Sequence, residues 1–106
     1  MKYDKELFVK HLQGMVQIPT VSSADPEKTR VDDFLKLHEY LAEAYPLVNK
    51  TLTREVIGKC ALLYRWKGTG KSDKLPLLMT AHQDVVPEGD HSMWKYPPFS
   101  GHVDED

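Results

Sequence analysis

Apolar residues recur at helical spacing near the start of the chain. In the stretch 4–18 they approach an i, i+4, i+7 pattern, at Leu7, Phe8, Leu12, Met15 and Val16. Asp4 is suited to cap the first turn, because its side chain can accept a hydrogen bond from a free backbone N–H. Pro19 imposes an extended conformation on Ile18, which ends the helix. The pattern therefore predicts a first helix over residues 4–18.

A second helical pattern follows the segment 19–29, which is rich in turn-forming residues. Asp25 and Pro26 have the order of an N-cap and a first helical residue, and Pro46 sets the other end. The apolar positions between them share one face, at Val31, Phe34, Leu35, Leu41 and Ala42. His38 lies within this apolar stripe, and we expect it to be packed or half-buried.

The hydrophobic period changes in the second half of the chain. Residues 47–58, 60–68 and 75–82 are short runs rich in β-branched or apolar residues, which is typical of strands. Little more than Gly58 and Lys59 joins the first two runs, so we expect an antiparallel hairpin. The third run is apolar on both sides of its pleat, which favours a central strand covered on both faces. The chain is thus predicted to be α/β, with two helices followed by three strands of a mixed sheet.

The composition is typical of a globular chain of one domain at most. The 106 residues are 41% hydrophobic and 28% charged, and acids and bases are mixed along the chain with a net charge of −2. This mixture argues against binding to nucleic acid or to a membrane surface. The N-terminal residues are too charged for a signal peptide, and we expect a soluble, cytoplasmic protein. The single cysteine, Cys60, excludes an internal disulfide and is expected to be a small buried residue.

The sequence GTGKS at residues 68–72 resembles the end of a phosphate-binding P-loop. The first glycine of that motif would fall at position 65, which is Arg65. The motif also requires a helix directly after the serine, whereas DKLP and another predicted strand follow here. We therefore interpret these residues as a hairpin loop and not as a nucleotide site.

The third predicted strand ends in two residues with chemical potential, His82 and Asp84. Residues two apart on a strand point to the same side, so the two side chains can act as a pair. A carboxylate that accepts one ring N–H of a histidine favours the other nitrogen as a metal ligand. The same pair would suit a general base with its orienting acid, or a turn capped by Asp84. The spacing alone leaves these alternatives open.

The sequence around this pair resembles the zinc-dependent family of carboxypeptidases, aminoacylases, acetylornithine deacetylases and succinyl-diaminopimelate desuccinylases, and within it the carboxypeptidase S-like branch most. In that family a strand ends in a small residue followed by His-x-Asp-Val-Val-Pro, with Trp, Pro-Phe and Ser-Gly at short range. The corresponding residues here are Ala81, His82, Asp84, Val85, Val86, Pro87, Trp94, Pro97, Pro98, Phe99, Ser100 and Gly101. The segment QIPTVSS at residues 17–23 also matches the family's end of its first helix.

The resemblance implies a di-zinc hydrolase that cleaves a C-terminal residue from a peptide or an acyl group from an N-acyl amino acid. It makes His82 a ligand of one of two zinc ions, with cobalt or manganese as possible replacements, and Asp84 the carboxylate that orients the His82 ring. In the family, a glutamate then deprotonates a zinc-bridging water for attack on the amide carbonyl. A homodimer is compatible with the family for the complete protein.

The resemblance also implies that residues 1–106 are an incomplete N-terminal part of the catalytic domain. The bridging aspartate, the general-base glutamate, the other ligands and the dimerisation domain would all follow residue 106, so we expect the chain alone to be inactive. His91 and His102 are expected to be solvated loop residues, and Trp94, Tyr96 and Phe99 to pack beside the metal site. A stand-alone, non-enzymatic interaction domain that keeps half of the fold is the alternative.

Overall fold

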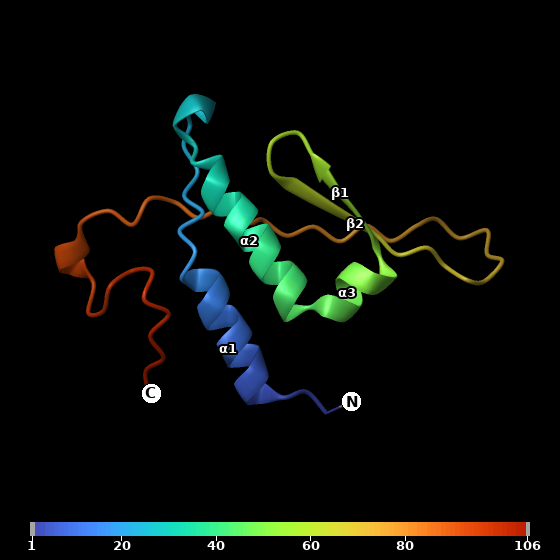
Figure 1. Cartoon of the computed structure of the whole chain (residues 1–106), viewed down its shortest axis with the longest axis horizontal. Coiled ribbons are helices and arrows are strands. Elements are labelled where there is room, and N and C mark those ends of the chain that lie inside the picture. Colours follow the sequence, from blue (N-terminus) through green and yellow to red (C-terminus); the bar gives the residue numbers. More distant parts are fainter. Residues whose placement is uncertain (1, 106) are drawn as a thin grey trace.

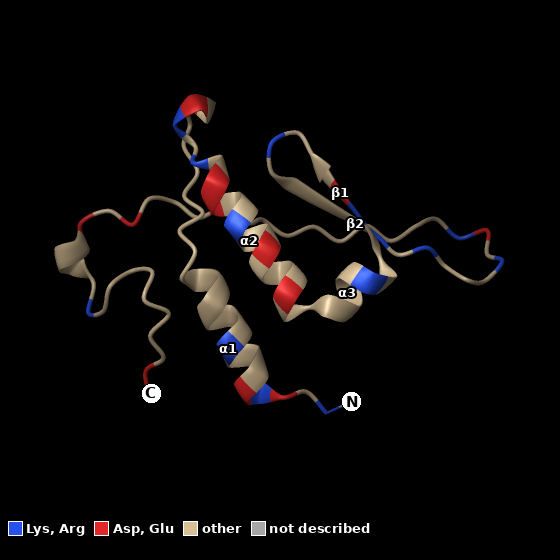
Figure 2. Ribbon diagram, viewed as in Figure 1, with Lys and Arg blue, Asp and Glu red and all other residues tan. Residues whose placement is uncertain are grey.

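The fold is mixed α/β, with three α-helices and a two-stranded antiparallel sheet in the part of the chain that is described. The structure is a computed structural model that describes residues 2–105. Its elements, in chain order, are α1 (Lys5–Val16), α2 (Val31–Ala44), α3 (Pro46–Thr51), β1 (Thr53–Ile57) and β2 (Ala61–Arg65), with 3₁₀ turns at Pro26–Lys28 and His91–Met93 (Figure 1). Acidic and basic residues are interspersed along the chain (Figure 2). Within residues 2–105, no helix has the length and apolar character needed to cross a membrane.

The first predicted helix is confirmed as α1. The Asp4 carboxylate accepts a hydrogen bond from the Leu7 N–H at 3.0 Å, as expected of an N-cap. Helix α1 lies beside α2, and Gly14 allows the close approach because an added Cβ there would collide with the Tyr40 ring (Figure 1). Tyr40 donates a hydrogen bond to the His11 carbonyl oxygen at 3.1 Å, which fastens α2 to α1.

The second helix begins later than predicted. Asp25 and Pro26 do open a helical turn, but it is the 3₁₀ turn Pro26–Lys28, and α2 starts at Val31. Thr29 interrupts the two because its backbone is extended, with φ −71° and ψ 123°. The prediction of a helix from Pro26 is therefore wrong for its first turn, although Asp25 accepts a capping hydrogen bond from the Glu27 N–H at 3.2 Å.

The buried face of α2 forms a small core. Phe34 and Leu37 are 4% and 6% exposed, and His38 on the same face is 2% exposed, which confirms its predicted packing role. Asp33 is also buried, and its charge is balanced by Arg30 Nε and Lys36 Nζ, each 3.1 Å from a carboxylate oxygen. Helix α2 is thus the element against which α1 and α3 pack.

The predicted strand over residues 47–58 is wrong in its first half. Residues Pro46–Thr51 form helix α3, and β1 starts only at Thr53. Pro46 ends α2 because it lacks an N–H, and the same property makes proline well suited to the first position of a new helix. Its helix-breaking and helix-starting roles both apply at this single position.

The predicted hairpin is confirmed. Strands β1 and β2 pair antiparallel, with Ile57 opposite Ala61 at the turn. Gly58 has φ +63°, a conformation that glycine adopts without strain. Cys60 lies in this turn and is only partly buried, so the expectation of a small buried residue is wrong.

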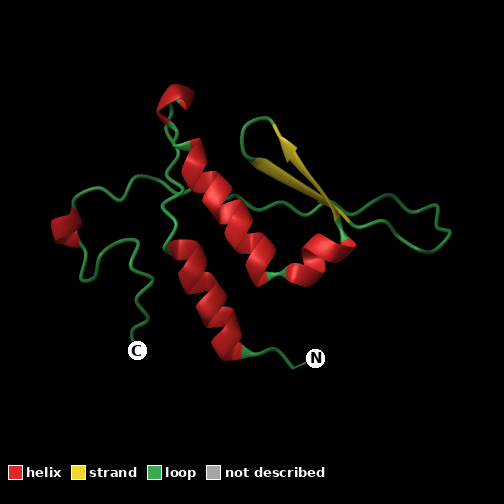
Figure 3. Ribbon diagram, in the orientation of Figure 1, coloured by secondary structure: helices red, strands yellow, loops and turns green. Residues whose placement is uncertain are grey.

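The third predicted strand does not form. Residues 75–82 belong to a long loop and pair with no strand of the described chain (Figure 3). Their apolar side chains are between 77% and 91% exposed, at Leu75, Leu77, Leu78 and Met79. A strand needs a neighbour with which to exchange backbone hydrogen bonds, and β2 pairs with β1 alone. The segment 68–72, predicted as a hairpin loop, therefore leads from β2 into an unpaired stretch.

Candidate functional site

Two segments that are far apart in the sequence meet beside α2. Residues 20–22 and 83–85 run parallel and form a single bridge between Val21 and Val85. The Ser22 N–H donates to the Val85 carbonyl at 3.1 Å, and the Val85 N–H donates to the Thr20 carbonyl at 3.0 Å. The buried Thr20 hydroxyl adds a hydrogen bond of 2.7 Å to the Gln83 carbonyl. This pairing holds the His82–Asp84 segment against the turn that follows α1.

Gln83 fastens the same segment from its other side. Its side-chain N–H donates to the Cys60 carbonyl oxygen at 3.0 Å, which leaves its Oε1 facing His38 Nε2 at 2.8 Å. Because Oε1 is an acceptor, His38 Nε2 must carry the proton of this hydrogen bond. One side chain therefore links the loop to α2 and to the turn of the β-hairpin.

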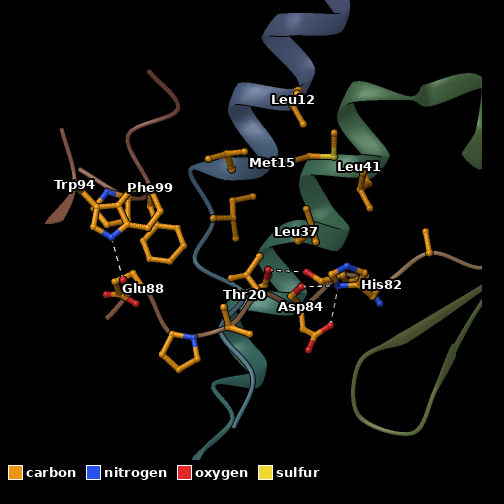
Figure 4. A pocket seen from close by; sticks show the side chains of 18 residues that line it. Leu12, Met15, Thr20, Leu37, Leu41, His82, Asp84, Glu88, Trp94 and Phe99 are labelled. Atoms are coloured by element: carbon orange, nitrogen blue, oxygen red, sulfur yellow. Dashed lines mark hydrogen bonds and ion pairs between the residues drawn. The ribbon is translucent and has the colours of Figure 1, made fainter. Parts of the chain in front are cut away.

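His82 and Asp84 lie side by side, as the spacing predicts. His82 Nδ1 is 2.7 Å from the Asp84 carbonyl oxygen and 3.1 Å from Asp84 Oδ1 (Figure 4). Both of these oxygens are acceptors when the carboxylate is ionised, so Nδ1 carries the ring proton and Nε2 of the neutral ring keeps its lone pair. The His82 side chain is 83% exposed, so Nε2 is open to a ligand.

The second oxygen of the Asp84 carboxylate is held by Ser22. The Ser22 hydroxyl donates to Asp84 Oδ2 at 2.6 Å, across 62 positions of the sequence. This hydrogen bond, followed by the one from His82, lowers the pKa of Asp84 below its ordinary value. The carboxylate is therefore ionised at neutral pH and remains an acceptor for the His82 ring.

The pair lies at the border of an apolar groove of about 750 Å³. Helices α1 and α2 form one wall, residues 81–88 cross the floor, and the loop that carries Trp94 and Phe99 closes the far end (Figure 4). The apolar side chains that line it include Leu12, Met15, Leu37, Leu41, Trp94 and Phe99. The groove thus has an apolar surface directly beside the polar side chains of His82 and Asp84. This combination is typical of a small-molecule binding site.

Within residues 2–105, the other predicted candidates make no hydrogen bond or ion pair with His82 or Asp84, although Trp94 and Phe99 line the same groove. Trp94 is fixed by a hydrogen bond of 3.0 Å from its indole N–H to the Glu88 carbonyl, while Tyr96 stacks on His102 with ring centroids 3.6 Å apart. His91 Nε2 lies 3.0 Å from Glu88 Oε1. Over residues 2–105 there is no group of three or more His, Cys, Asp and Glu residues able to hold a metal ion. The residues with possible metal-donor side chains that line the groove are His82, Asp84 and Glu88, and of these His82 and Asp84 are in contact with each other.

Three residues of the site, Thr20, Ser22 and Gln83, could not be assigned from the sequence. Their roles depend on contacts between residues 20–22 and 83–85, on α2 and on the hairpin turn. The only signal in the sequence is that Thr20 and Ser22 belong to the segment 17–23, which resembles the family without indicating a role for either residue.

Similarity to known proteins covers most of this chain. Carboxypeptidase S of Saccharomyces cerevisiae is 41% identical over 103 residues, which cover 91% of this chain and 18% of that protein. A protein of Dictyostelium discoideum whose name describes it as carboxypeptidase S-like is 45% identical over 73 residues, covering 69% and 14%. The N-fatty-acyl-amino acid synthase/hydrolase PM20D1 of Bos taurus is 38% identical over 92 residues, covering 85% and 18%.

The chain belongs to the carboxypeptidase S-like family. This assignment confirms the branch that the motifs around His82 indicate. A match over 91% of the chain necessarily contains both segments that pair at the site. The carboxypeptidase S-like chain spans less than a fifth, 18%, of the length of the yeast relatives that it matches. No protein-family model and no solved structure matches it.

Proposed function

We propose that the chain is the N-terminal part of a zinc-dependent hydrolase that cleaves the amide bond of a C-terminal residue in a peptide or of an N-acyl amino acid. The names of the relatives support this substrate class, since one is a carboxypeptidase and another an N-fatty-acyl-amino acid synthase/hydrolase. In a peptide, the C-terminal residue is joined by an amide bond to the acyl group of the residue before it, and an N-fatty-acyl-amino acid contains the same kind of bond. The shared chemistry is hydrolysis of that amide bond.

The hydrogen-bonding state of His82 is the observation that carries the proposal. With its proton on Nδ1, the ring presents Nε2 as a free lone pair at the border of the groove, and neutral imidazole nitrogen is a good zinc ligand. The ionised Asp84 beside it increases the basicity of the ring and fixes its orientation. These two residues therefore fit one position of a zinc site.

Zinc, when bound, supplies a Lewis acid that polarises the amide carbonyl and activates water. The residues of this chain would hold the zinc ion, orient its histidine ligand and bind the substrate. His82 offers Nε2, Asp84 accepts the hydrogen bond that keeps the ring proton on Nδ1, and the groove excludes water from the apolar part of the substrate. A catalytic zinc site normally uses three protein ligands, so residues from outside this chain must complete it, and the chain alone is expected to be inactive.

The test is a substitution in the longer protein that contains this chain and the sequence encoded downstream of it. His82→Ala should lower zinc-dependent amide hydrolysis by at least about 100-fold. Loss of an orienting partner typically costs about 10- to 100-fold, and loss of a direct ligand should cost at least the upper value. His91→Ala is the matched control, since His91 contacts Glu88 and not the pair, and it should retain activity. Full activity of His82→Ala would refute the ligand role.

An interaction domain without catalytic activity is the second candidate. The observation that favours it is the exposed apolar run at Leu75, Leu77, Leu78 and Met79, whose backbone is unpaired. Such a stretch can bind another chain by strand addition. A natural stop codon directly after residue 106 and tight self-association of the purified chain would support this function, whereas downstream sequence encoding further metal ligands would support the hydrolase.

A further inference from the structure

We propose that Ser22 is a positioning residue, which holds the Asp84 carboxylate against His82 and thereby selects the ring form with its lone pair on Nε2. The functional meaning of this role rests on the proposed function, because it concerns the nitrogen offered to zinc. The role itself concerns three side chains of this chain and is testable without any metal.

The carboxylate of Asp84 has a separate partner for each oxygen. Oδ2 accepts from the Ser22 hydroxyl at 2.6 Å, and Oδ1 lies 3.1 Å from His82 Nδ1. A carboxylate is an acceptor only, so Ser22 must donate its single hydroxyl proton to it. Rotation of the carboxylate about its Cβ–Cγ bond would break both contacts together. The Ser22 hydrogen bond therefore opposes the motion that would release His82.

Ser22 is itself held in place by the backbone. Its N–H donates to the Val85 carbonyl at 3.1 Å in the parallel bridge, one residue after Asp84. The next residue, Ser23, is fixed by a hydrogen bond of 3.2 Å from its N–H to Thr29 Oγ1. The hydroxyl thus reaches Asp84 from a defined position and not from a freely moving loop.

The effect of losing the Ser22 hydroxyl on the ring form of His82 is limited, because the ring has a second hydrogen-bond acceptor. Nδ1 also lies 2.7 Å from the carbonyl oxygen of Asp84, which stays in place when the carboxylate rotates. Loss of Ser22 should therefore weaken the preference for the Nδ1–H form without abolishing it. One net hydrogen bond corresponds to about 2- to 12-fold in an equilibrium, and we expect a change in this range.

The test measures the two neutral ring forms of His82 in this chain by nitrogen NMR of the imidazole, at about pH 8, where histidine is neutral. The His82→Gln spectrum assigns the signals. We expect Nδ1–H to dominate in the parent chain, and Ser22→Ala to lower the ratio of Nδ1–H to Nε2–H by about 2- to 12-fold. Ser22→Thr, which keeps the hydroxyl, should restore the parent ratio. An unchanged ratio in Ser22→Ala would overturn the proposal.

Two controls separate this role from general loss of structure. Ser23→Ala makes the same chemical change at the next position, away from Asp84, and should leave the ratio unchanged. If Ser22→Ala does not fold, the isosteric pair Ser22→Thr and Ser22→Val gives the same comparison, with Thr parent-like and Val shifted. Equal ratios in that pair would also overturn the proposal.

A zinc measurement in the longer protein distinguishes failure of this role from failure of the proposed function. Competition with a chromophoric chelator should show weaker zinc binding in Ser22→Ala, by less than the about 10- to 100-fold typical of losing the orienting carboxylate itself. If His82→Ala weakens zinc binding but Ser22→Ala changes neither the ring ratio nor the affinity, only the role of Ser22 is refuted. If His82→Ala binds zinc normally, the proposed function fails, and a shifted ring ratio still supports the Ser22–Asp84–His82 contact.

Discussion

The apolar residues 75–80 and the polar residues 82–84 follow one another on the chain but have opposite environments. The first stretch exposes Leu75, Leu77, Leu78 and Met79 and makes no sheet pairing with the described chain. The second is tied to the turn after α1, to α2 and to the hairpin turn by the hydrogen bonds of Gln83 and Asp84. The more hydrophobic stretch is thus the less anchored of the two.

The difference shows what each kind of residue needs in order to be held. An apolar side chain is stabilised only by a surface that removes it from water, and within residues 2–105 no element covers residues 75–80. Gln83 and Asp84 instead find individual donors and acceptors on elements that are already present. Directional hydrogen bonds to a few atoms therefore position the His82–Asp84 pair although the neighbouring apolar stretch is exposed.

The largest expected effect is on the free energy of unfolding, when the same Leu-to-Ala change is made in a buried and in an exposed environment. Leu37→Ala should lower the free energy of unfolding by about 2–5 kcal/mol, because Leu37 is buried on α2 and leaves a cavity. Leu77→Ala, in the exposed stretch, should change it by no more than about 0.5 kcal/mol. Denaturant unfolding of the two variants measures the difference. Equal losses would mean that residues 75–80 are packed in solution.

A smaller effect is expected from removing the anchor of the polar segment. Gln83→Leu should lower the free energy of unfolding by about 1–3 kcal/mol, because it leaves His38 Nε2 buried without its acceptor. Hydrogen exchange of the Val85 N–H, which bonds to Thr20, should become faster as the segment loosens.

Gln17→Leu is the matched control for this change. The Gln17 side chain donates to the Ser100 carbonyl at 3.0 Å, but that hydrogen bond is exposed to solvent. Its loss should alter stability by about 0.5 kcal/mol or less and leave Val85 protected. Unchanged exchange of Val85 in Gln83→Leu would show that the hydrogen bonds from Thr20 and Ser22 are sufficient to hold the segment.

The smallest effect on stability is expected from the surface ion pair between Lys95 and Asp104. Lys95 Nζ donates to Asp104 Oδ2 at 2.8 Å, and this hydrogen bond lowers the pKa of Asp104 below its ordinary value of 3.8. A depressed pKa in the folded state means that the pair stabilises the fold above pH 3.8, and that this contribution is lost as pH falls through the lowered value.

Lys95→Met should raise the pKa of Asp104 towards 3.8, as followed by NMR titration of the side-chain carboxyl carbon. Both side chains of the pair are largely exposed, so we expect only a small change in stability. Lys74→Met, which removes a charge elsewhere, should leave this titration unchanged. A pKa of Asp104 that does not respond to Lys95→Met would show that the pair does not persist in solution.

Features with local signals were predictable from the sequence, and those that depend on distant partners were not. The Asp4 cap and the hairpin turn at Gly58 are determined within a few residues, and both are confirmed. The local pattern does not predict helix α3, because Val48 and Thr51 favour a strand and Pro46 also fits the end of the preceding helix. The prediction of a third strand is wrong because the apolar run at 75–82 has no strand to pair with in the described chain.

The candidate site divides in the same way. The contact between His82 and Asp84 follows from their spacing of two residues, and it is confirmed as a hydrogen bond. The hydrogen bond between Ser22 and Asp84 joins residues 62 positions apart, and no local sequence pattern predicts it. Chain positions that carry chemistry were thus easier to find than the residues that hold them in place.

The most direct test of the account is a crystal structure of the longer protein with zinc, with anomalous diffraction recorded at the zinc absorption edge. We predict a zinc peak about 2.0–2.1 Å from Nε2 of His82. The Nδ1 atom should still face Asp84, as it does here. Zinc bound elsewhere in the protein, with His82 Nε2 free of any ion, would contradict the central claim.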